Sequence, residues 1–511
     1  MLLASRTQIQ SISNILSMRY RYNYSKRTNL DLFSNEAISR SLKSKSTTTI
    51  FREWLVYKLL SFDVITNNAD AILRGAHKLL GEKVTHWLLK KTIYKQFVAG
   101  EENYEVLERI KELDKQNIKV FLSYAAEQTD KNSEAEFEKL KNHILDCIRI
   151  VVDFSEKDRV TAIKISPLTP LYLQKKINSI IKSKQRWFLQ LSGQSNEDLN
   201  AITLQTLEQK IRTIEPALTY ASIESMFQQV SGNKDNITAR RWQDNLVKGT
   251  NLYELLKRKS NDLEELTHEE NIILSEFIRR IDEIGNMCEA NNVKLLVDAE
   301  QTYIQKFIHQ TAVHHLMKKL NTNKCIVYNT YQCLLRNTEN ELKFDLEYAK
   351  EENFIYGLKM VRGAYLLEER RLAKEMGYPD PTNPNIQSTT AMYNRVMDIC
   401  MREVQRNNMR LMVATHNRDS VTRATQQLEK LGIPKEGGIL FGQVFGICDY
   451  VSYSLAQAGY VIYKTVPYGP VMEVIPYLIR RAQENRSLMK GADFERKVLG
   501  REIVNRLIYR K

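Results

Sequence analysis

The chain has 511 residues and a hydrophobic content of 43%, which excludes general disorder and leaves room for several average domains or one large barrel with additions. Its formal net charge of +14 indicates an acidic partner: nucleic acid, an anionic membrane face or an anionic small molecule. The six cysteines form no CxxC pair, so the sequence predicts neither a zinc ribbon nor a disulfide framework. No apolar run approaches the roughly 18 residues of a membrane span.

Residues 1–34 are basic and rich in serine and apolar side chains. The cations Arg6, Arg19, Arg21, Lys26 and Arg27 precede the first acid, Asp31. This composition predicts a mitochondrial transit peptide, with a disordered basic terminus as the alternative. Residues 35–115 are expected to form an N-terminal helical arm ahead of a domain over 116–511.

Eight short runs rich in β-branched and aromatic residues follow, separated by amphipathic segments of helical length. They are IKVFLSYA, VTAIKIS, VKLLVDAE, CIVYNTYQ, IYGLKMVRGAY, MRLMVATHN, GILFGQVFG and YVIYKTVPYG, beginning at residues 118, 160, 293, 325, 355, 409, 438 and 460. Each is typical of a buried parallel strand. Strands that alternate with helices predict a distorted (β/α)8 barrel of the TIM type. An open doubly wound sheet is the alternative, but the chain lacks the GxGxxG turn that a dinucleotide would need. Between the second and third strands, residues 172–292 are predicted to be a helical insertion.

Polar side chains end most of the predicted strands. They are Lys164, Asp298, Asn329, Gln332, Lys359, Arg362, Thr415, His416, Asn417, Gln443, Lys464, Thr465 and Tyr468. Because a barrel carries its chemistry at the carboxyl ends of its strands, these residues predict a deep polar mouth.

A late helical segment, VMEVIPYLIRRAQEN, carries two adjacent arginines among apolar residues. Helical spacing places Tyr477, Arg480, Arg481 and Glu484 along one stripe. One interpretation is a solvated face, and the other is a guanidinium clamp for a carboxylate. Cations outnumber Asp298 and Glu484 at the mouth, which favours an anionic ligand: a substrate carboxylate or a cofactor phosphate.

Other chemistries have weak support. His309, His314 and His315 share one segment but lack the HExxH order, so partnered or exposed histidines are favoured over a metal site, and no metal is predicted. Asp298 could act alone as a general base, whereas a glycosidase needs a second placed carboxylate. No GxSxG motif supports a serine hydrolase.

The segments VDAEQTY, VYNTYQC, KMVRGAY, VATHN, FGQVFGICD and YKTVPYGPVMEVIPYLIRRAQEN closely resemble the proline dehydrogenase family, in the family's order. The resemblance implies a flavoenzyme with FAD on a distorted (β/α)8 barrel. It implies oxidation of L-proline to 1-pyrroline-5-carboxylate, the first step of proline catabolism to glutamate, by hydride transfer from C5 to the flavin N5. For eukaryotic members it further implies electron transfer to ubiquinone at the matrix face of the mitochondrial inner membrane, to which the protein is peripherally bound.

The same resemblance implies roles for single residues. Arg480, Arg481 and Lys164 would hold the substrate carboxylate, with Tyr365, Thr465 and Tyr477 lining the substrate pocket. Asp298 would orient the cations and Lys359 would stabilise negative charge on the reduced flavin, so these two are the predicted catalytic residues. The predicted FAD contacts are Asn329, Lys359, Arg362, Gly363, Ala364, Thr415, His416 and Glu484.

Two departures from the family pattern bear on substrate and cofactor. Many bacterial relatives carry Arg in place of Lys359 and Gln in place of Asn329. Thr465 stands where proline-selective relatives usually have a tyrosine, and the hydroxyproline dehydrogenase branch is smaller and more polar there. A threonine opens space and offers a hydrogen bond, so L-proline and trans-4-hydroxy-L-proline both remain candidate substrates.

Two alternatives lie outside this family. A folate reductase also uses a flavin-bearing barrel but has no use for the arginine pair. A basic RNA- or membrane-binding protein is the non-enzymatic alternative, and it predicts a basic patch with interleaved aromatics. The insertion instead mixes both charge signs, so no nucleic-acid partner is expected.

Overall fold

The computed structural model describes residues 32–62, 64–65, 68–124, 133–155, 158–192, 201–260, 263–471, 474–475, 478 and 486–508. Segment 1–31 of the predicted basic terminus therefore lies outside the described residues. No helix of the described part of the chain is long and apolar enough to cross a membrane.

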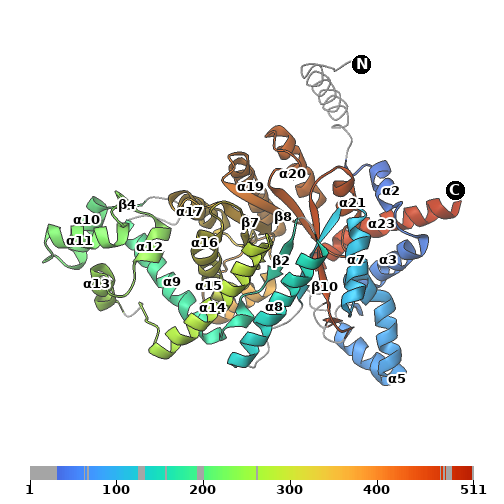
Figure 1. The fold of residues 1–511 in the computed structure, drawn as a ribbon, viewed down its shortest axis with the longest axis horizontal. Coiled ribbons are helices and arrows are strands. Elements are labelled where there is room, and N and C mark those ends of the chain that lie inside the picture. Colours follow the sequence, from blue (N-terminus) through green and yellow to red (C-terminus); the bar gives the residue numbers. More distant parts are fainter. Residues whose placement is uncertain are drawn as a thin grey trace, which may run out of the picture.

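Eight parallel strands close into a barrel at the centre of the molecule (Figure 1). In barrel order they are β1 (Ile118–Tyr124), β2 (Val160–Ile163), β5 (Lys294–Val297), β6 (Val327–Gln332), β7 (Tyr356–Val361), β8 (Met409–Ala414), β9 (Ile439–Val444) and β10 (Ile462–Tyr468). β10 returns to pair with β1 from Ile118↔Ile462 to Tyr124↔Tyr468. All eight predicted strands are present, and the predicted barrel is confirmed.

Helices link the strands and cover the outside of the barrel. They are α8 (Glu134–Phe154), α15 (Thr302–His309), η3 (Gln310–Met317), α16 (Lys318–Leu320), α17 (Thr338–Glu351), α18 (Leu366–Met376), α19 (Ile386–Gln405), α20 (Arg418–Lys430), α21 (Asp449–Gln457) and α23 (Arg486–Ile508). Four asparagines with positive φ, Asn117, Asn292, Asn353 and Asn407, end the helices that precede β1, β5, β7 and β8. Asparagine tolerates this left-handed turn better than most residues, so the sequence itself stops these helices just before the strands.

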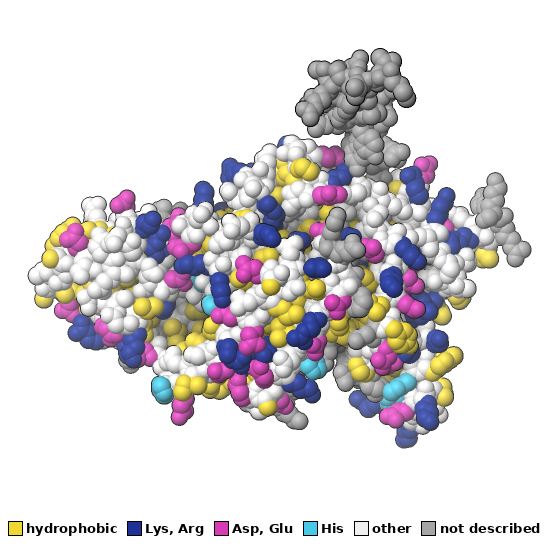
Figure 2. All heavy atoms as spheres, viewed as in Figure 1, with side chains coloured by type: hydrophobic (Ala, Val, Ile, Leu, Met, Phe, Trp, Pro, Cys, Tyr) yellow, Lys and Arg dark blue, Asp and Glu magenta, His cyan; other side chains and the backbone are white. Residues whose placement is uncertain are grey.

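Between β2 and β5 the chain forms a largely helical lobe, at the left of Figure 1. It comprises η2 (Ser166–Leu168), α9 (Leu171–Ser192), β3 (Ile202–Thr203), α10 (Leu204–Ile214), α11 (Tyr220–Ser231), β4 (Asn236–Ile237), α12 (Ala239–Asn245), α13 (Asn251–Lys259) and α14 (His268–Ala290). The short antiparallel pair β3–β4 was not predicted. Trp242 and Phe188 pack in a separate hydrophobic cluster of this lobe. Figure 2 shows basic and acidic side chains interspersed over its visible surface, with no single-sign field.

Ahead of β1 the chain forms α2 (Asn35–Leu42), α3 (Thr47–Leu60), α5 (Ala69–Leu89), η1 (Lys90–Tyr94), α6 (Lys95–Phe97) and α7 (Asn103–Asp114). α3 lies beside the C-terminal helix α23, at the right of Figure 1. Arg506 of α23 donates to the carbonyl oxygens of Leu42 (2.8 Å) and Lys45 (2.7 Å). The two ends of the described chain therefore pack together on one side of the barrel.

A buried charge cluster connects the helical lobe to the barrel's outer layer. Arg240 of α12 contacts Asp345 (2.7 Å) and Glu341 (2.6 Å) of α17, and Arg240 and Asp345 are 2% and 0% exposed. His309 also contacts Asp345, at 3.1 Å. Burial alone would raise the pKa of Asp345, but Arg240 and His309 lower it well below its usual range. The carboxylate is therefore ionised in the folded protein.

We expect Asp345→Leu to destabilise the fold by about 3–5 kcal/mol, because it removes the fully buried carboxylate that pairs with buried Arg240. Urea unfolding followed by far-UV circular dichroism measures the effect. The double variant Arg240→Met, Asp345→Leu should lose less stability than Asp345→Leu alone, since it leaves no unpaired charge. Equal stability of Asp345→Leu and the unmodified protein would show that the pair does not hold the lobe.

Candidate active site

The inner wall of the barrel has an apolar floor and a polar rim. Phe121, Val160, Leu296, Tyr328, Met412, Leu440 and Tyr463, one from each of seven strands, form the buried floor cluster. Successive residues of a strand point alternately to its two faces. Residues two or four positions after a floor residue therefore point into the same barrel interior. Those positions hold Lys164, Asp298, His416 and Thr465. Lys359 of β7 joins them because it pairs with Met412 of the floor.

An ion pair occupies this rim. The Lys359 Nζ lies 2.7 Å from the Asp298 Oδ1, with side-chain exposures of 12% and 27%. The same ammonium lies 5.8 Å from the ring centroid of Phe121, on the floor. The structure thus brings together the two residues that the sequence predicted to be catalytic.

Glu300 is a second carboxylate at this rim, which the sequence interpretation missed. It is 6% exposed and accepts a hydrogen bond of 2.7 Å from the Ser166 Oγ. Burial raises its pKa, the nearby Asp298 acts in the same direction, and Lys164 acts against them. Asp298, Glu300 and Lys164 therefore form one electrostatic group. The signal was present in VDAE, because Asp298 and Glu300 are two positions apart at the end of one strand.

The loop after β7 presents a guanidinium and a close backbone. Arg362 donates to the Oγ1 of Thr415 (2.5 Å) and the Oγ of Ser420 (2.9 Å), and it lies 4.4 Å from the ring centroid of Tyr393. Gly363 has φ +120°, and a Cβ there would collide with the side chain of Leu334. Only glycine fits this position without strain. Ala364 follows, and half-buried Tyr365 is the N-cap of α18.

His416 offers a buried hydrogen-bond donor. Its Nε2 accepts from the backbone N of Val444 at 3.4 Å, whereas its Nδ1 is buried with no partner among the described residues. Burial, with a smaller contribution from Lys464, lowers the pKa of His416 to about 3, so the ring is neutral. A neutral ring carries one proton, and the Val444 contact assigns it to Nδ1. The Nδ1–H is therefore available to an acceptor atom of a ligand.

Asn329, a predicted cofactor contact, turns its side chain away from the barrel interior, so the structure does not bring it together with the other rim residues. It lies one position from Tyr328 of the floor, and its Nδ2 contacts the Nδ1 of His309 on α15 at 3.1 Å. Gln332 has the inward phase instead. Its Oε1 accepts from the backbone N of Ala364 at 3.4 Å, and its Nε2 donates to the Glu300 carbonyl at 2.8 Å.

The remaining predicted residues divide into two groups. Thr465 is half-buried in β10, where it pairs in register with Phe121 of β1 and Val444 of β9. Tyr477, Arg480, Arg481 and Glu484 lie outside the described residues, so the clamp remains a prediction.

The N-terminal arm supplies charges to the segment behind this site. Lys45 lies 2.6 Å from the Asp449 Oδ2, and Lys464, which is 1% exposed, lies 2.9 Å from the Asp449 Oδ1. Lys464 also donates to the Ile447 carbonyl at 2.7 Å. Burial alone would raise the pKa of Asp449, but Lys45 and Lys464 lower it well below its usual range. The three charges hold the 444–449 loop that positions His416.

Four hydrogen bonds made by three side chains complete this attachment. Tyr57 of α3 donates to the Gly446 carbonyl, and Gln96 of α6 donates to the same oxygen at 3.1 Å. Gly446 has φ +75°, and a Cβ there would collide with the Gln96 carbonyl oxygen. Glu495 of α23 accepts from the backbone N of Cys448 (2.7 Å) and of Asp449 (2.9 Å).

Three histidines that could suggest a metal are partnered instead by carboxylates. His309, His314 and His315 contact Asp345 (3.1 Å), Asp244 (2.6 Å) and Asp282 (2.9 Å). Within the described ranges, no group of three or more metal-ligating side chains is arranged to hold an ion.

We expect Glu495 to make stability depend on pH. Burial, reinforced by Asp449, raises its pKa from 4.5 to about 7, so the folded protein retains this proton more strongly than the unfolded chain does. The resulting stabilisation is present below pH 4.5 and is lost as pH rises through 7. Glu495→Gln cannot titrate, so its melting temperature should fall below that of the unmodified protein by more at pH 5 than at pH 7.5. Glu264→Gln, at an exposed site, controls for net charge, and a gap independent of pH would contradict the assignment.

Comparison with known proteins agrees with this architecture. The family model described as "Proline dehydrogenase" matches residues 106–492. Proline dehydrogenase 1, mitochondrial, of Homo sapiens is 31% identical, with 91% of this chain and 88% of that protein covered. Hydroxyproline dehydrogenase of Rattus norvegicus is 32% identical, with 91% and 93% covered.

A solved structure shows the same fold. Proline utilization A (PutA) from Bdellovibrio bacteriovorus matches with a TM-score of 0.57 at 16% identity, over 94% of this chain. The match spans only 43% of that longer protein. It therefore shows a shared fold, and it does not indicate the activities of the whole PutA chain.

Proposed function

Because this chain belongs to the proline dehydrogenase family, we propose that it oxidises L-proline to 1-pyrroline-5-carboxylate with FAD as cofactor. The observation that carries the proposal is the charged group on the inner rim, where Lys164, Lys359, Asp298 and Glu300 surround one interior. A small zwitterion needs both signs of charge there. Lys164 would attract the substrate carboxylate, and Asp298 would keep Lys359 in place. Arg480 and Arg481 would complete the carboxylate site, and Tyr365 and Tyr477 would line it.

The residues of the rim fit FAD. Gly363 allows close backbone approach, Arg362 provides a cation, and the Nδ1–H of His416 is a buried donor without a partner in the described structure. Arg362, Gly363, Ala364, Thr415 and His416 would hold the cofactor, with Gln332 in the role first expected of Asn329. Glu484 is retained as a proposed contact from the clamp helix. When bound, FAD supplies the two-electron acceptor that oxidation of a carbon–nitrogen bond requires.

The proposal also includes an electron acceptor and a cellular location. Several relatives are named mitochondrial, and the basic, serine-containing residues 1–34 suit an import signal. We propose that the protein works in mitochondria, bound peripherally to the matrix face of the inner membrane, and passes electrons to ubiquinone.

A second substrate is supported by Thr465. The side chain faces the interior beside Phe121, where a threonine leaves more room than a tyrosine and offers a hydroxyl. Oxidation of trans-4-hydroxy-L-proline on the same scaffold is therefore the alternative function. The proline dehydrogenase and the hydroxyproline dehydrogenase compared above have nearly the same sequence identity to this chain, 31% and 32%.

Anaerobic reduction of the flavin by each substrate tests the function. L-proline should bleach the flavin absorbance of the purified protein faster than trans-4-hydroxy-L-proline does. The opposite order would assign the chain to hydroxyproline oxidation, and a protein that neither contains nor takes up flavin would refute the proposal.

We expect Thr465→Tyr to lower the rate of flavin reduction by hydroxyproline at least about tenfold relative to proline, because the phenol fills the space that a ring hydroxyl needs. Stopped-flow absorbance measures both rates. Thr465→Val keeps the side-chain volume and should change the ratio less. If Thr465→Tyr slows both substrates equally, the residue does not select between them.

We expect Gly363→Ala to lower the bound FAD per protein about tenfold, since the added methyl displaces Leu334 and the loop that would contact FAD. The ratio of flavin to protein absorbance measures occupancy, and circular dichroism verifies folding. Gly377→Ala is the matched control, because Gly377 also has a positive φ but a Cβ there meets nothing within 4 Å. Full occupancy in Gly363→Ala would remove this loop from the cofactor site.

A further inference from the structure

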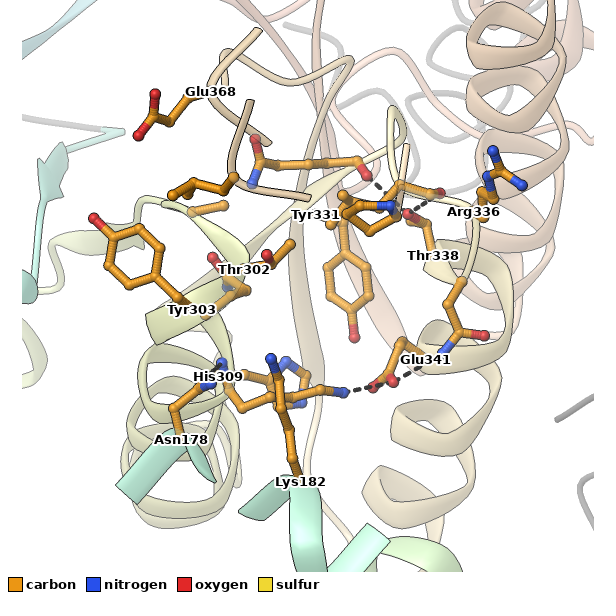
Figure 3. A pocket seen from close by; sticks show the side chains of 18 of the residues that line it. Asn178, Lys182, Thr302, Tyr303, His309, Tyr331, Arg336, Thr338, Glu341 and Glu368 are labelled. Carbon is orange, nitrogen blue, oxygen red and sulfur yellow. Dashed lines mark hydrogen bonds and ion pairs between the residues drawn. The ribbon is translucent and has the colours of Figure 1, made fainter. Parts of the chain in front are cut away.

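A second cavity lies on the outer side of β6, apart from the barrel mouth. Its volume is about 920 Å³, and its walls come from α9, α15, the end of β6, α17 and α18 (Figure 3). The outward-facing residues Asn329 and Tyr331 line it, whereas Lys359, Asp298 and Thr465 do not. Its size is that of pockets that enclose small organic molecules.

The cavity carries excess positive charge. Its lysine and arginine residues are Lys175, Lys182, Lys306, Arg336 and Arg371, and its carboxylates are Glu341 and Glu368. Lys306 pairs with Glu341 at 2.6 Å and Arg371 pairs with Glu368 at 2.7 Å, so both acids are already neutralised. The excess therefore lies with the other three cations, which favours an anionic ligand.

Lys182 is the cation best placed to meet such a ligand. Figure 3 shows its side chain extending from α9 toward the centre of the cavity, and no ion pair joins it to another described residue. Burial and the neighbouring Lys306 lower its pKa, while Glu369 opposes them. A bound anion would offset this unfavourable environment.

Asn329 adds a buried hydrogen-bond acceptor. The ionised Asp345 accepts a hydrogen bond from the Nε2–H of His309. Burial lowers the pKa of His309, so the ring is neutral and its Nδ1 is an acceptor. Asn329 must therefore turn its Nδ2 toward that nitrogen, and its Oδ1 then has no partner among the described residues although Asn329 is only 1% exposed. A buried acceptor without a hydrogen bond costs folding free energy. A ligand that donates a hydrogen bond to the Asn329 Oδ1 would therefore be stabilised there.

The rest of the lining is largely apolar or aromatic. Tyr303, Tyr331, Tyr378, Leu335, Leu372 and Met376 provide broad surfaces for a planar body. A compact hydroxy acid would leave most of this surface uncovered, whereas a nucleobase with its sugar would cover it.

We propose that this cavity binds a nucleoside monophosphate, with the phosphate at Lys182 and a hydroxyl or amino donor at the Asn329 Oδ1. A nucleoside monophosphate and a hydroxy dicarboxylate are both organic anions that carry a hydrogen-bond donor. A hydroxy dicarboxylate is therefore the alternative ligand for this cavity. The lining also includes Gln332 of the inner rim, but the two proposed ligand contacts, Lys182 and Asn329, face the outer cavity and not the barrel interior.

Isothermal titration of the flavin-loaded full chain with AMP, L-malate and inorganic phosphate tests the proposal. Prior FAD loading prevents AMP from occupying the cofactor site. We expect saturable AMP binding that Lys182→Met weakens about tenfold or more, the effect of losing one charged hydrogen bond. Lys234→Met removes the same charge from an exposed site outside the lining and should leave the AMP affinity unchanged.

Each outcome is decisive. AMP binding sensitive to Lys182→Met but not to Lys234→Met supports the site. Malate binding in preference to AMP with the same sensitivity overturns the nucleotide assignment. Binding of inorganic phosphate alone overturns the organic ligand, and no saturable binding, or equal weakening by both variants, overturns the site itself.

Discussion

Closure of the barrel by β1 and β10 is the constraint on which the inner rim depends. These strands come from opposite ends of the barrel sequence and pair in register over their full length. Because all eight strands are parallel, closure brings their carboxyl ends to one rim. Lys164 after β2, Asp298 after β5 and Lys359 on β7 then face the same interior, although none is near another in sequence. The ion pair of Lys359 and Asp298 is a product of that closure.

The N-terminal arm and α23 make the rim's irregular segments rigid. Loop backbone at a barrel mouth lacks the regular partners of a strand, so its polar groups need bonds from elsewhere. Tyr57 and Gln96 donate hydrogen bonds to the Gly446 carbonyl. Glu495 accepts hydrogen bonds from the backbone amides of Cys448 and Asp449. The Ala99 amide likewise bonds the Pro467 carbonyl at 2.9 Å, close to Thr465. The arm thus belongs to the architecture of the site.

Electrostatics separates the two polar regions of the molecule. At the inner rim, cations and carboxylates are mixed, and burial keeps His416 neutral as a donor. In the outer cavity both carboxylates are neutralised, and the remaining charge is positive. The strand β6 lies between these regions: Asn329 faces outward, and Gln332, which faces inward, also lines part of the outer cavity. One strand therefore contributes side chains to both regions.

The sequence by itself determined the eight strands, the barrel and most of the rim, because strand composition, asparagine helix ends and polar strand ends are local properties. It could not decide whether Asn329 or Gln332 faces the interior, since that phase depends on how β6 pairs with its neighbours. It also missed Glu300, whose role depends on Ser166 and Lys164 folding beside it. Lys45 and Asp449 are 404 positions apart, and only tertiary structure decided their contact. Desolvation of both charges, which makes that contact strong, exists only after the chain has folded around them.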